Sequence, residues 1–291
     1  MSRVPPERSV KARMTVAGAL LASMLCALVA LFVLDIPTAR AGNDCDARPL
    51  APARLADAAQ TGLLVAAELD KRDAPVALVS RVGTDLSKHG LVYSHAGFAV
   101  RDHPDGRWTV VHMLSDCSAE GSGLYAEGLV NFFADDLVRQ DARITWLRPK
   151  IAEQLARRLT MLEHDPLYTP RYNLIARPGS PDYQNSTAWV LEHIAAAASD
   201  RDTGSRAQAY RLAQAHGFVP DRIHIPYRKR IMGGLFAKNM SFTDHSIATR
   251  LSGDYPVITV RSILRWLGAS GFAQQELERR MGVWSERPGP G

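Results

Sequence analysis

The stretch Tyr93-Ser94-His95-Ala96-Gly97-Phe98 begins an apolar segment typical of a β-strand, and Val110-Val111-His112-Met113 lies in a second one. Between them, Asp102-His103-Pro104-Asp105-Gly106 is a cluster of turn-forming residues, so the sequence predicts a β-hairpin. Successive side chains of a strand point to opposite faces of its sheet. An even register would place His95 and His112 on one face within roughly 8 Å, whereas a slip by one residue would separate them.

A third segment, Gln184-Asn185-Ser186-Thr187, precedes an apolar stretch and predicts a helix over residues 185–198. Asn185 is a favourable N-cap residue, which places the Ser186 hydroxyl in the first turn of this helix. Backbone N–H groups are free there, and the positive end of the helix dipole stabilises a developing negative charge. Ser186 is therefore a candidate nucleophile.

Together, the three segments predict a catalytic site. Ser186 would attack a carbonyl carbon, His95 would remove the hydroxyl proton, and His112 would orient the His95 ring. A backbone N–H near Ser186, with Gln184 or Tyr183, would hold the oxyanion. Each residue also has a simpler explanation, because a serine that only caps a helix contributes about 1 kcal/mol without any chemistry. A strand histidine is commonly just a buried ring, so only the combination favours an enzyme.

Asp244 and His245 form a further polar pair. His245 could join this site, or could bind zinc with His95 and His112, because three histidines and a carboxylate suit this metal. No local spacing of ligands supports a zinc centre, so we expect neither a metal nor another cofactor.

The remaining segments predict an α+β protein. Strands are expected at 76–82, 144–147, 223–226 and 257–260, and helices at 54–70, 149–164, 205–216, 262–267 and 273–281. Because strands and helices do not alternate regularly, a small antiparallel sheet packed against helices is more consistent with this order than a doubly wound sheet.

Residues 1–41 have the features of an export signal. Basic residues precede an uncharged apolar run over 14–34, and Ala39-Arg40-Ala41 provides small residues for cleavage. Cleavage would leave residues 42–291 as a single α+β domain with a C-terminal helical extension, located in the periplasm or secreted. The apolar run is also long enough to span a bilayer, so an uncleaved segment would anchor the protein in the inner membrane.

Most of the positive charge belongs to this N-terminal segment, which contributes +3 of the net +5 and leaves +2 for the rest. The charge therefore gives no reason to expect nucleic-acid binding, and membrane contact is expected only through an uncleaved N-terminal segment. Two cysteines follow the signal, Cys45 and Cys117. An oxidising compartment would allow them to form a disulfide.

At the candidate site, the sequence resembles the permuted NlpC-type branch of the papain-like superfamily. The resemblance rests on Ser94-His95-Ala96-Gly97-Phe98, on His112, and on Gln184-Asn185-Ser186 with Trp189 and Glu192. That branch includes the lecithin:retinol acyltransferase-like enzymes and related bacterial amidases. Most of residues 42–291 is more closely similar to an uncharacterised bacterial family, catalogued as domain of unknown function 2145, through the stretches 80–83, 93–100, 172–192 and 242–245.

The superfamily resemblance implies a circularly permuted papain-like fold, with a small antiparallel sheet packed against the nucleophile helix. It also implies thiol-mediated hydrolysis or acyl transfer on amides and esters. His95 would correspond to the general base, His112 to the orienting polar residue, and Ser186 to a position that is normally Cys. A thiol of lowered pKa is already partly ionised, whereas a serine hydroxyl needs a well-aligned base.

We therefore expect an exported hydrolase or acyltransferase with a Ser/His/His site. Its substrate would be an envelope amide or ester, such as a peptidoglycan peptide or a lipid. Serine in place of cysteine favours an alternative, a catalytically inactive ligand-binding module on the same fold. In either case Tyr183, Gln184, Asn185, Asp244 and His245 would be binding residues. A zinc-dependent hydrolase is the second alternative.

Overall fold

The computed structural model describes residues 50–116, 121–135, 137–162, 165–199, 203–230 and 239–287. All of them belong to one compact unit, Gly42–Gly291. The predicted export signal and both cysteines of the predicted disulfide lie outside the described residues. Among the described helices, none has both the length and the apolar character that a membrane crossing requires.

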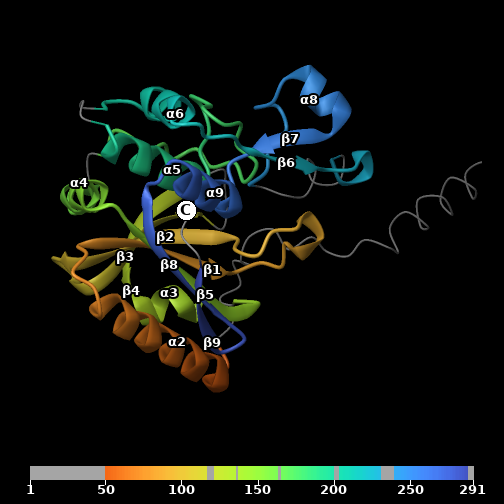
Figure 1. Cartoon of the computed structure of the whole chain (residues 1–291). Helices are drawn as coiled ribbons and strands as arrows, with labels where there is room; N and C mark the ends of the chain where they lie inside the picture. Colours follow the sequence, from red (N-terminus) through yellow and green to blue (C-terminus); the bar gives the residue numbers. More distant parts are fainter. Residues whose placement is uncertain are drawn as a thin grey trace, which may run out of the picture. The chain divides into compact units, whose positions relative to one another are not determined.

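Seven strands in the described part of the chain form one antiparallel sheet (Figure 1), in the order β4-β3-β2-β1-β5-β8-β9. Their bounds are β1 (Val76–Val82), β2 (His95–His103), β3 (Gly106–Ser115), β4 (Ser122–Gly128), β5 (Arg139–Leu147), β8 (Ala273–Arg280) and β9 (Val283–Arg287). The α+β class and the antiparallel pairing are thus confirmed, and the sheet is larger than expected.

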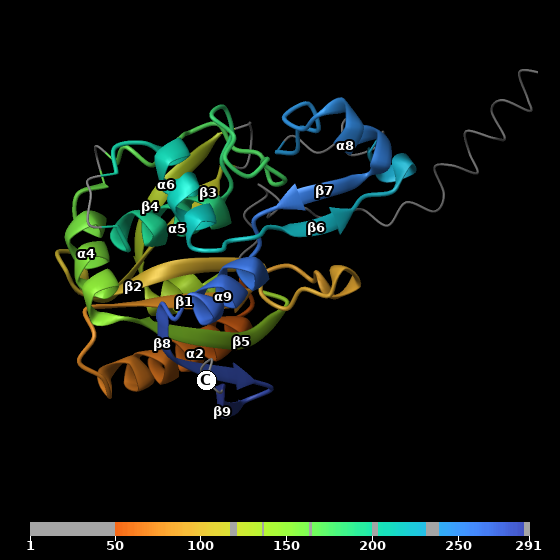
Figure 2. The ribbon, with the colours of Figure 1, turned by 45° about the horizontal axis from the view of Figure 1, so that its top comes forward.

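Helices cover both faces of this sheet (Figures 1 and 2). On one face lie α2 (Pro52–Asp70) and α3 (Leu129–Ala134), and on the other lie α4 (Pro149–Leu159), α5 (Ser186–Ala197) and α9 (Val260–Ala269). Neighbouring strand residues belong to different apolar clusters, since Val110 packs with the α2–α3 face and Val111 with the α5 face. Burial on both faces explains why the central strands are apolar runs rather than alternating sequences.

The β2–β3 hairpin forms where the turn cluster predicts it. His103 pairs with Gly106 across a two-residue loop, Pro104-Asp105. Gly106 has a φ of 132°, a backbone conformation that L side chains rarely adopt, which explains a glycine at the end of this turn. The register of the hairpin is therefore fixed locally, and it determines which side chains share a face.

The remaining elements pack around this core. Helix α6 (Arg206–Ala215) contacts α5, and the short helix η1 (Ser87–His89) follows β1. Strands β6 (Asp221–His224) and β7 (Asp254–Val257) form a separate two-stranded sheet, which α8 (Ile247–Ser252) adjoins (Figure 2).

The predicted helix over 273–281 is wrong, because this segment is strand β8. Its Ala, Gln, Glu, Leu and Arg residues favour a helix, but pairing with β5 overrides that propensity. Glu276 and Glu278 are buried in the strand and form ion pairs with Arg143 and Arg287. Strands β8 and β9 extend the main sheet in the region where the sequence predicts a C-terminal helical extension.

Candidate functional site

His95 and His112 lie next to each other on one face of the sheet. Phe98 pairs with Val111, so His112 lies opposite Gly97 and diagonally from His95. The ring centroids are 5.1 Å apart, and His95 Nε2 and His112 Nδ1 share a hydrogen bond of 2.8 Å. The even register expected from the sequence is confirmed.

Gly97 provides the space for this arrangement. A Cβ atom at this position would lie 2.7 Å from Val110 Cγ1 and 3.0 Å from His112 Cβ. Any side chain here would therefore displace the His112 ring or push β2 and β3 apart.

Helix α3 covers the histidine pair with an aromatic ring. The centroid of the Phe132 ring is 5.9 Å from that of His95 and 5.3 Å from that of His112. Helix α3 follows β4 directly, at Gly128, so the short connection holds it over β3 and β4. Both imidazoles are consequently buried, and His95 retains only 8% exposure.

Arg81 brings a buried positive charge to the same face. It pairs with His95 across β1 and β2, and its side chain is almost fully buried. Its guanidinium donates to the Phe132 carbonyl and, at 2.6 Å, to Asp135 Oδ2. A buried guanidinium requires such partners, because removing a charge from water without them is costly.

Glu127 completes a row formed by a carboxylate and two imidazoles. Its Oε1 lies 2.9 Å from His112 Nε2, although the direction is unsuitable for a hydrogen bond and Nε2 has no such partner within the described residues. The nearby carboxylate favours a proton on His112 Nε2. His112 Nδ1 then accepts, His95 Nε2 donates, and His95 Nδ1 remains as an acceptor.

A cleft of about 350 Å³ opens beside this row, lined by Arg81, Leu114, Glu127, Asn131, Ala134 and Asp135. The carboxylates of Glu127 and Asp135 are 27% and 29% exposed, whereas the guanidinium between them is buried. The walls of the cleft therefore present negative charge and hydrogen-bond acceptors to a ligand.

The pKa of His95 lies well below its usual value of 6.5. Burial is the main cause, and the positive charges of Arg81 and of His112, when protonated, lower it further. The ring is therefore neutral at pH 7, which agrees with a hydrogen-bonded imidazole inside an apolar layer.

Ser186 does not lie with the histidines. Helix α5 packs on the opposite face of β2 and β3, where the Trp189 and Phe98 ring centroids are 5.6 Å apart. Phe98 and His95 point to opposite faces, since Phe98 is three positions after His95 on the same strand. The Ser186 side chain interacts instead with the Tyr172 hydroxyl, whose pKa burial raises to about 12. The sheet thus lies between the predicted nucleophile and its predicted base.

The residues expected to assist Ser186 have internal partners. Both functional groups of the Gln184 amide are engaged, because Nε2 donates to Leu167 O and Glu192 Oε2, and Oε1 accepts from Thr169 N. Asn185 caps α5 by accepting from Ala188 N at 2.7 Å. Neither side chain is free to hold an oxyanion.

Tyr183 packs against the Arg171 guanidinium, which also donates to its hydroxyl. Its contacts therefore connect two parts of the loop before α5.

Asp244 and His245 are not at the histidine pair either. Asp244 accepts from Arg177 N at 2.7 Å and from Ser180 Oγ at 2.6 Å. His245 Nε2 donates to Ile175 O at 2.7 Å, and the ring packs edge-on against Tyr255. These bonds connect the loop before α5 to the segment before α8. His245 packs against Tyr255, whereas the histidine pair packs against Phe132 in a different apolar cluster, so the structure does not bring the three histidines together as a zinc site requires.

Within the described ranges, no group of three or more His, Cys, Asp or Glu side chains is arranged to hold a metal ion. The sequence reasoning also missed Arg81, Glu127 and Asp135, which join the histidines. Arg81 gave a usable signal, because an arginine inside an apolar strand has to find buried partners. Glu127 and Asp135 gave none that distinguishes them from surface carboxylates.

The fold and the site define an α+β protein with a buried histidine pair beside an acidic cleft. The chain belongs to the bacterial family described as "Uncharacterized protein conserved in bacteria (DUF2145)", whose model matches residues 68–267. This range includes the hairpin, α3 and α5. No curated protein and no solved structure matches the chain.

Proposed function

We propose that this chain is a ligand-binding module of the bacterial cell envelope, with the cleft beside His95 and His112 as its binding site. The observation that supports this most is the position of Ser186, on the other side of the sheet from both histidines. A serine hydroxyl is nucleophilic only when a base removes its proton during the attack. The expected hydrolase or acyltransferase mechanism lacks that base.

The state of His95 also favours binding over catalysis. A general base works best when its pKa lies near the working pH. The pKa of His95 is lowered well below 6.5, chiefly by burial. The His95 imidazole is therefore poorly suited to take up a proton as a general base.

The ligand that fits this cleft bears an amino group. Glu127 and Asp135 line the cleft and provide partly exposed carboxylate side chains. An ammonium group donates three hydrogen bonds and carries the complementary charge. Envelope location rests on the signal-like residues 1–41, and the amines of peptidoglycan peptides would be natural ligands there.

The permuted papain-like placement is part of this proposal. The two strand histidines followed by a helix with a buried polar N-terminus support it, because that is the order of the permuted branch. The start of α5 occupies the same position in the chain order as the nucleophile helix of that branch. Its residues, however, cap and anchor α5 and do not face the histidines.

A serine-directed fluorophosphonate probe tests the absence of chemistry. We expect the probe not to label Ser186. Any labelling of the purified protein should persist in at least one of the variants Ser186→Ala and His95→Ala. Labelling that depends on both residues would overturn the proposal and restore the hydrolase.

Binding is tested by titrating Nα-acetyl-lysine amide and following backbone amide resonances. Its Nε-acetylated form is the matched neutral probe. Shifts should cluster around α3 and β4, and Glu127→Gln should weaken binding about tenfold, the usual contribution of a charged hydrogen bond. Glu153→Gln, an exposed carboxylate on α4, is the control. Equal binding of both probes would contradict an amine ligand.

A further inference from the structure

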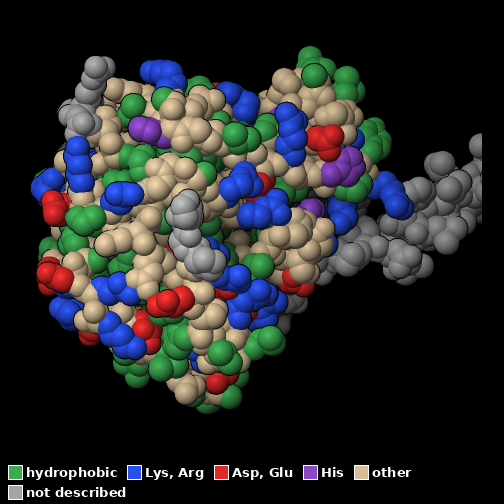
Figure 3. Space-filling model, viewed as in Figure 1, with side chains coloured by type: hydrophobic (Ala, Val, Ile, Leu, Met, Phe, Trp, Pro, Cys, Tyr) green, Lys and Arg blue, Asp and Glu red, His purple; other side chains and the backbone are tan. Residues whose placement is uncertain are grey.

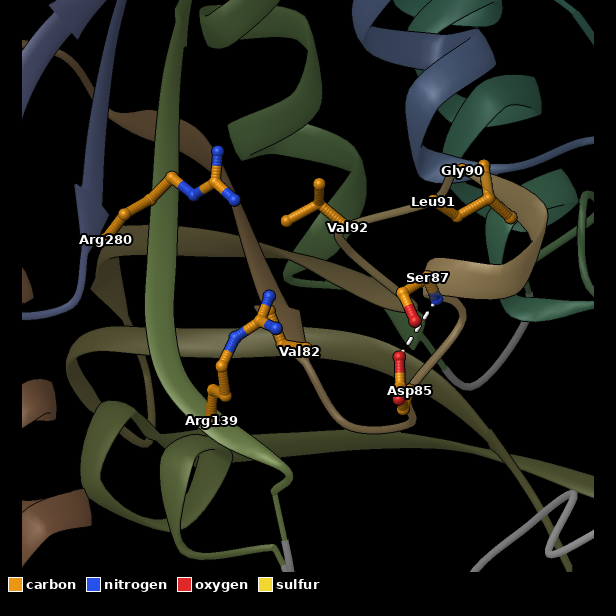
Figure 4. Close-up of a pocket in the computed structure, with 8 residues that line it drawn as sticks. All are labelled: Val82, Asp85, Ser87, Gly90, Leu91, Val92, Arg139 and Arg280. Atoms are coloured by element: carbon orange, nitrogen blue, oxygen red, sulfur yellow. Dashed lines mark hydrogen bonds between the residues drawn. The ribbon is translucent and has the colours of Figure 1, made fainter.

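A second hollow, of about 230 Å³, opens on the other face of the sheet. Arg81 and Val82 are consecutive on β1, so Arg81 faces the acidic cleft and Val82 faces this pocket. The pocket is also lined by the segment around η1, by Arg139 at the start of β5, and by Arg280 at the end of β8 (Figure 4).

Two guanidinium groups point into this pocket. Arg139 and Arg280 extend from neighbouring strands towards the space beside Val82 and Val92 (Figure 4). Arg139 is held by Asp141, with Nε 3.0 Å from Oδ2, which leaves its terminal nitrogens available. The exposed Arg280 side chain has no hydrogen bond or ion pair within the described part of the chain.

Like charges that converge repel each other, and an anion between them removes that repulsion. The surroundings add to the positive charge, because Arg261 donates to Gly90 O at 3.1 Å on the pocket rim. Figure 3 shows Lys and Arg side chains gathered beside hydrophobic ones near the middle of one face. Asp85 is the acidic lining residue, and one of its oxygens already accepts from Ser87 N at 2.9 Å.

The opposite wall is apolar. Val82, Leu91 and Val92 line it, and Leu91 is buried. The volume is below the roughly 300–1,000 Å³ of pockets for drug-sized ligands, so it suits a small group. A planar, forked guanidinium matches the two oxygens of a carboxylate.

We propose that the pocket between Arg139 and Arg280 binds the carboxylate of a small ligand with an aliphatic side chain, such as the C-terminus of a peptide. This site lies on the opposite face from the acidic cleft, and it does not depend on the function proposed for that cleft.

Calorimetric titration of the purified protein with acetyl-dialanine tests this site. Acetyl-dialanine amide lacks the charge, acetyl-diglycine lacks the methyl groups, and inorganic phosphate offers a different anion. We expect acetyl-dialanine to bind most tightly. Arg280→Gln should weaken it about tenfold, and Arg139→Gln similarly. Arg222→Gln, which removes an exposed charge on β6, should leave the affinity unchanged.

Four results would overturn the assignment. The amide could bind as well as the acid, or phosphate could bind more tightly than acetyl-dialanine. Acetyl-dialanine could also show no saturation below about 10 mM, or bind equally to wild type and both arginine variants. Chemical shifts in Arg280→Gln should match those of wild type outside the pocket, so that a loss of binding is not a loss of folding.

Discussion

His95 and His112 share a hydrogen bond on adjacent strands, inside the apolar layer between the sheet and α3. Each imidazole thus satisfies a nitrogen of the other without water. The arrangement requires His95 to stay neutral, because burial and the nearby charge of Arg81 disfavour a positive charge on its ring. The protein's response to acid should therefore depend on this contact.

Acid should destabilise the protein through His95. The folded-state pKa of His95 is lowered well below 6.5, so between these two values the unfolded chain binds a proton that the folded chain does not. The free energy of unfolding then falls as the pH falls below about 6.5, by up to about 1.4 kcal/mol per pH unit. Urea unfolding of wild type and His95→Gln between about pH 7.5 and about pH 5.5 measures this, and the variant should show the shallower slope.

His245 provides a comparison for that experiment. Its pKa is also lowered, mainly by burial, although its bond to the Ile175 carbonyl and the charge of Asp244 oppose the shift. His245→Gln should therefore reduce the slope in the same direction. If the free energy of unfolding changes equally with pH in wild type and in His95→Gln, His95 is not buried as a neutral ring.

Gly97→Ala should destabilise the protein by about 1–3 kcal/mol, because the new methyl group overlaps Val110 and His112. The imidazole proton signals of His112 should shift as well. Gly204→Ala is the control, since a Cβ there meets nothing within 4 Å and the change should stay within about 0.5 kcal/mol. Equal denaturant midpoints for the two variants would contradict the packing described for Gly97.

The hairpin could be predicted because its determinants are local. The turn cluster fixes the reversal, and strand alternation then places His95 and His112 on one face. The face on which a distant helix packs is not a local property. Both faces of this sheet are apolar, so the sequence of α5 is compatible with packing on either face. The sequence predicts Ser186 on the face of the histidines, whereas α5 packs on the opposite face.

Strand β8 is a second element whose structure depends on residues distant in the sequence. Its residues favour a helix one by one, but pairing with β5 and buried ion pairs for Glu276 and Glu278 stabilise a strand. The partners that decide this, Arg143 and Arg287, lie elsewhere in the sequence. Likewise, Glu127 and Asp135 join the site only because the β4–α3 connection brings them beside His112 and Arg81.

Asn185→Ala should cost more stability than Ser186→Ala. Asn185 accepts from Ala188 N, and its amide donates to Leu174 O at 3.1 Å, so its loss leaves both groups buried without a partner. We expect a loss of about 1–2 kcal/mol for Asn185→Ala and under about 1 kcal/mol for Ser186→Ala. Thermal unfolding of both variants measures this. The reverse order would mean that Ser186 supports the fold more than its contacts indicate.

Arg206 should stabilise the protein most at high pH, because it neutralises the buried Glu192. The Arg206 Nε lies 2.9 Å from Glu192 Oε2. Burial raises the pKa of Glu192 from 4.5 to about 7, although Arg206 and Gln184 oppose the shift. The folded chain therefore binds a proton that the unfolded chain releases between these values, and this group's contribution to stability falls as the pH rises through that range.

Arg206→Leu should therefore cost about 3–5 kcal/mol near pH 8, where Glu192 would be an uncompensated buried charge, and less near pH 5.5, where it is protonated. Adding Glu192→Gln should restore much of the loss near pH 8, because a neutral amide retains a polar partner for Gln184. Comparing each variant with wild type at the same pH removes the contribution of His95. A loss that is equal at both pH values, without rescue by Glu192→Gln, would mean that Arg206 acts through packing rather than through charge.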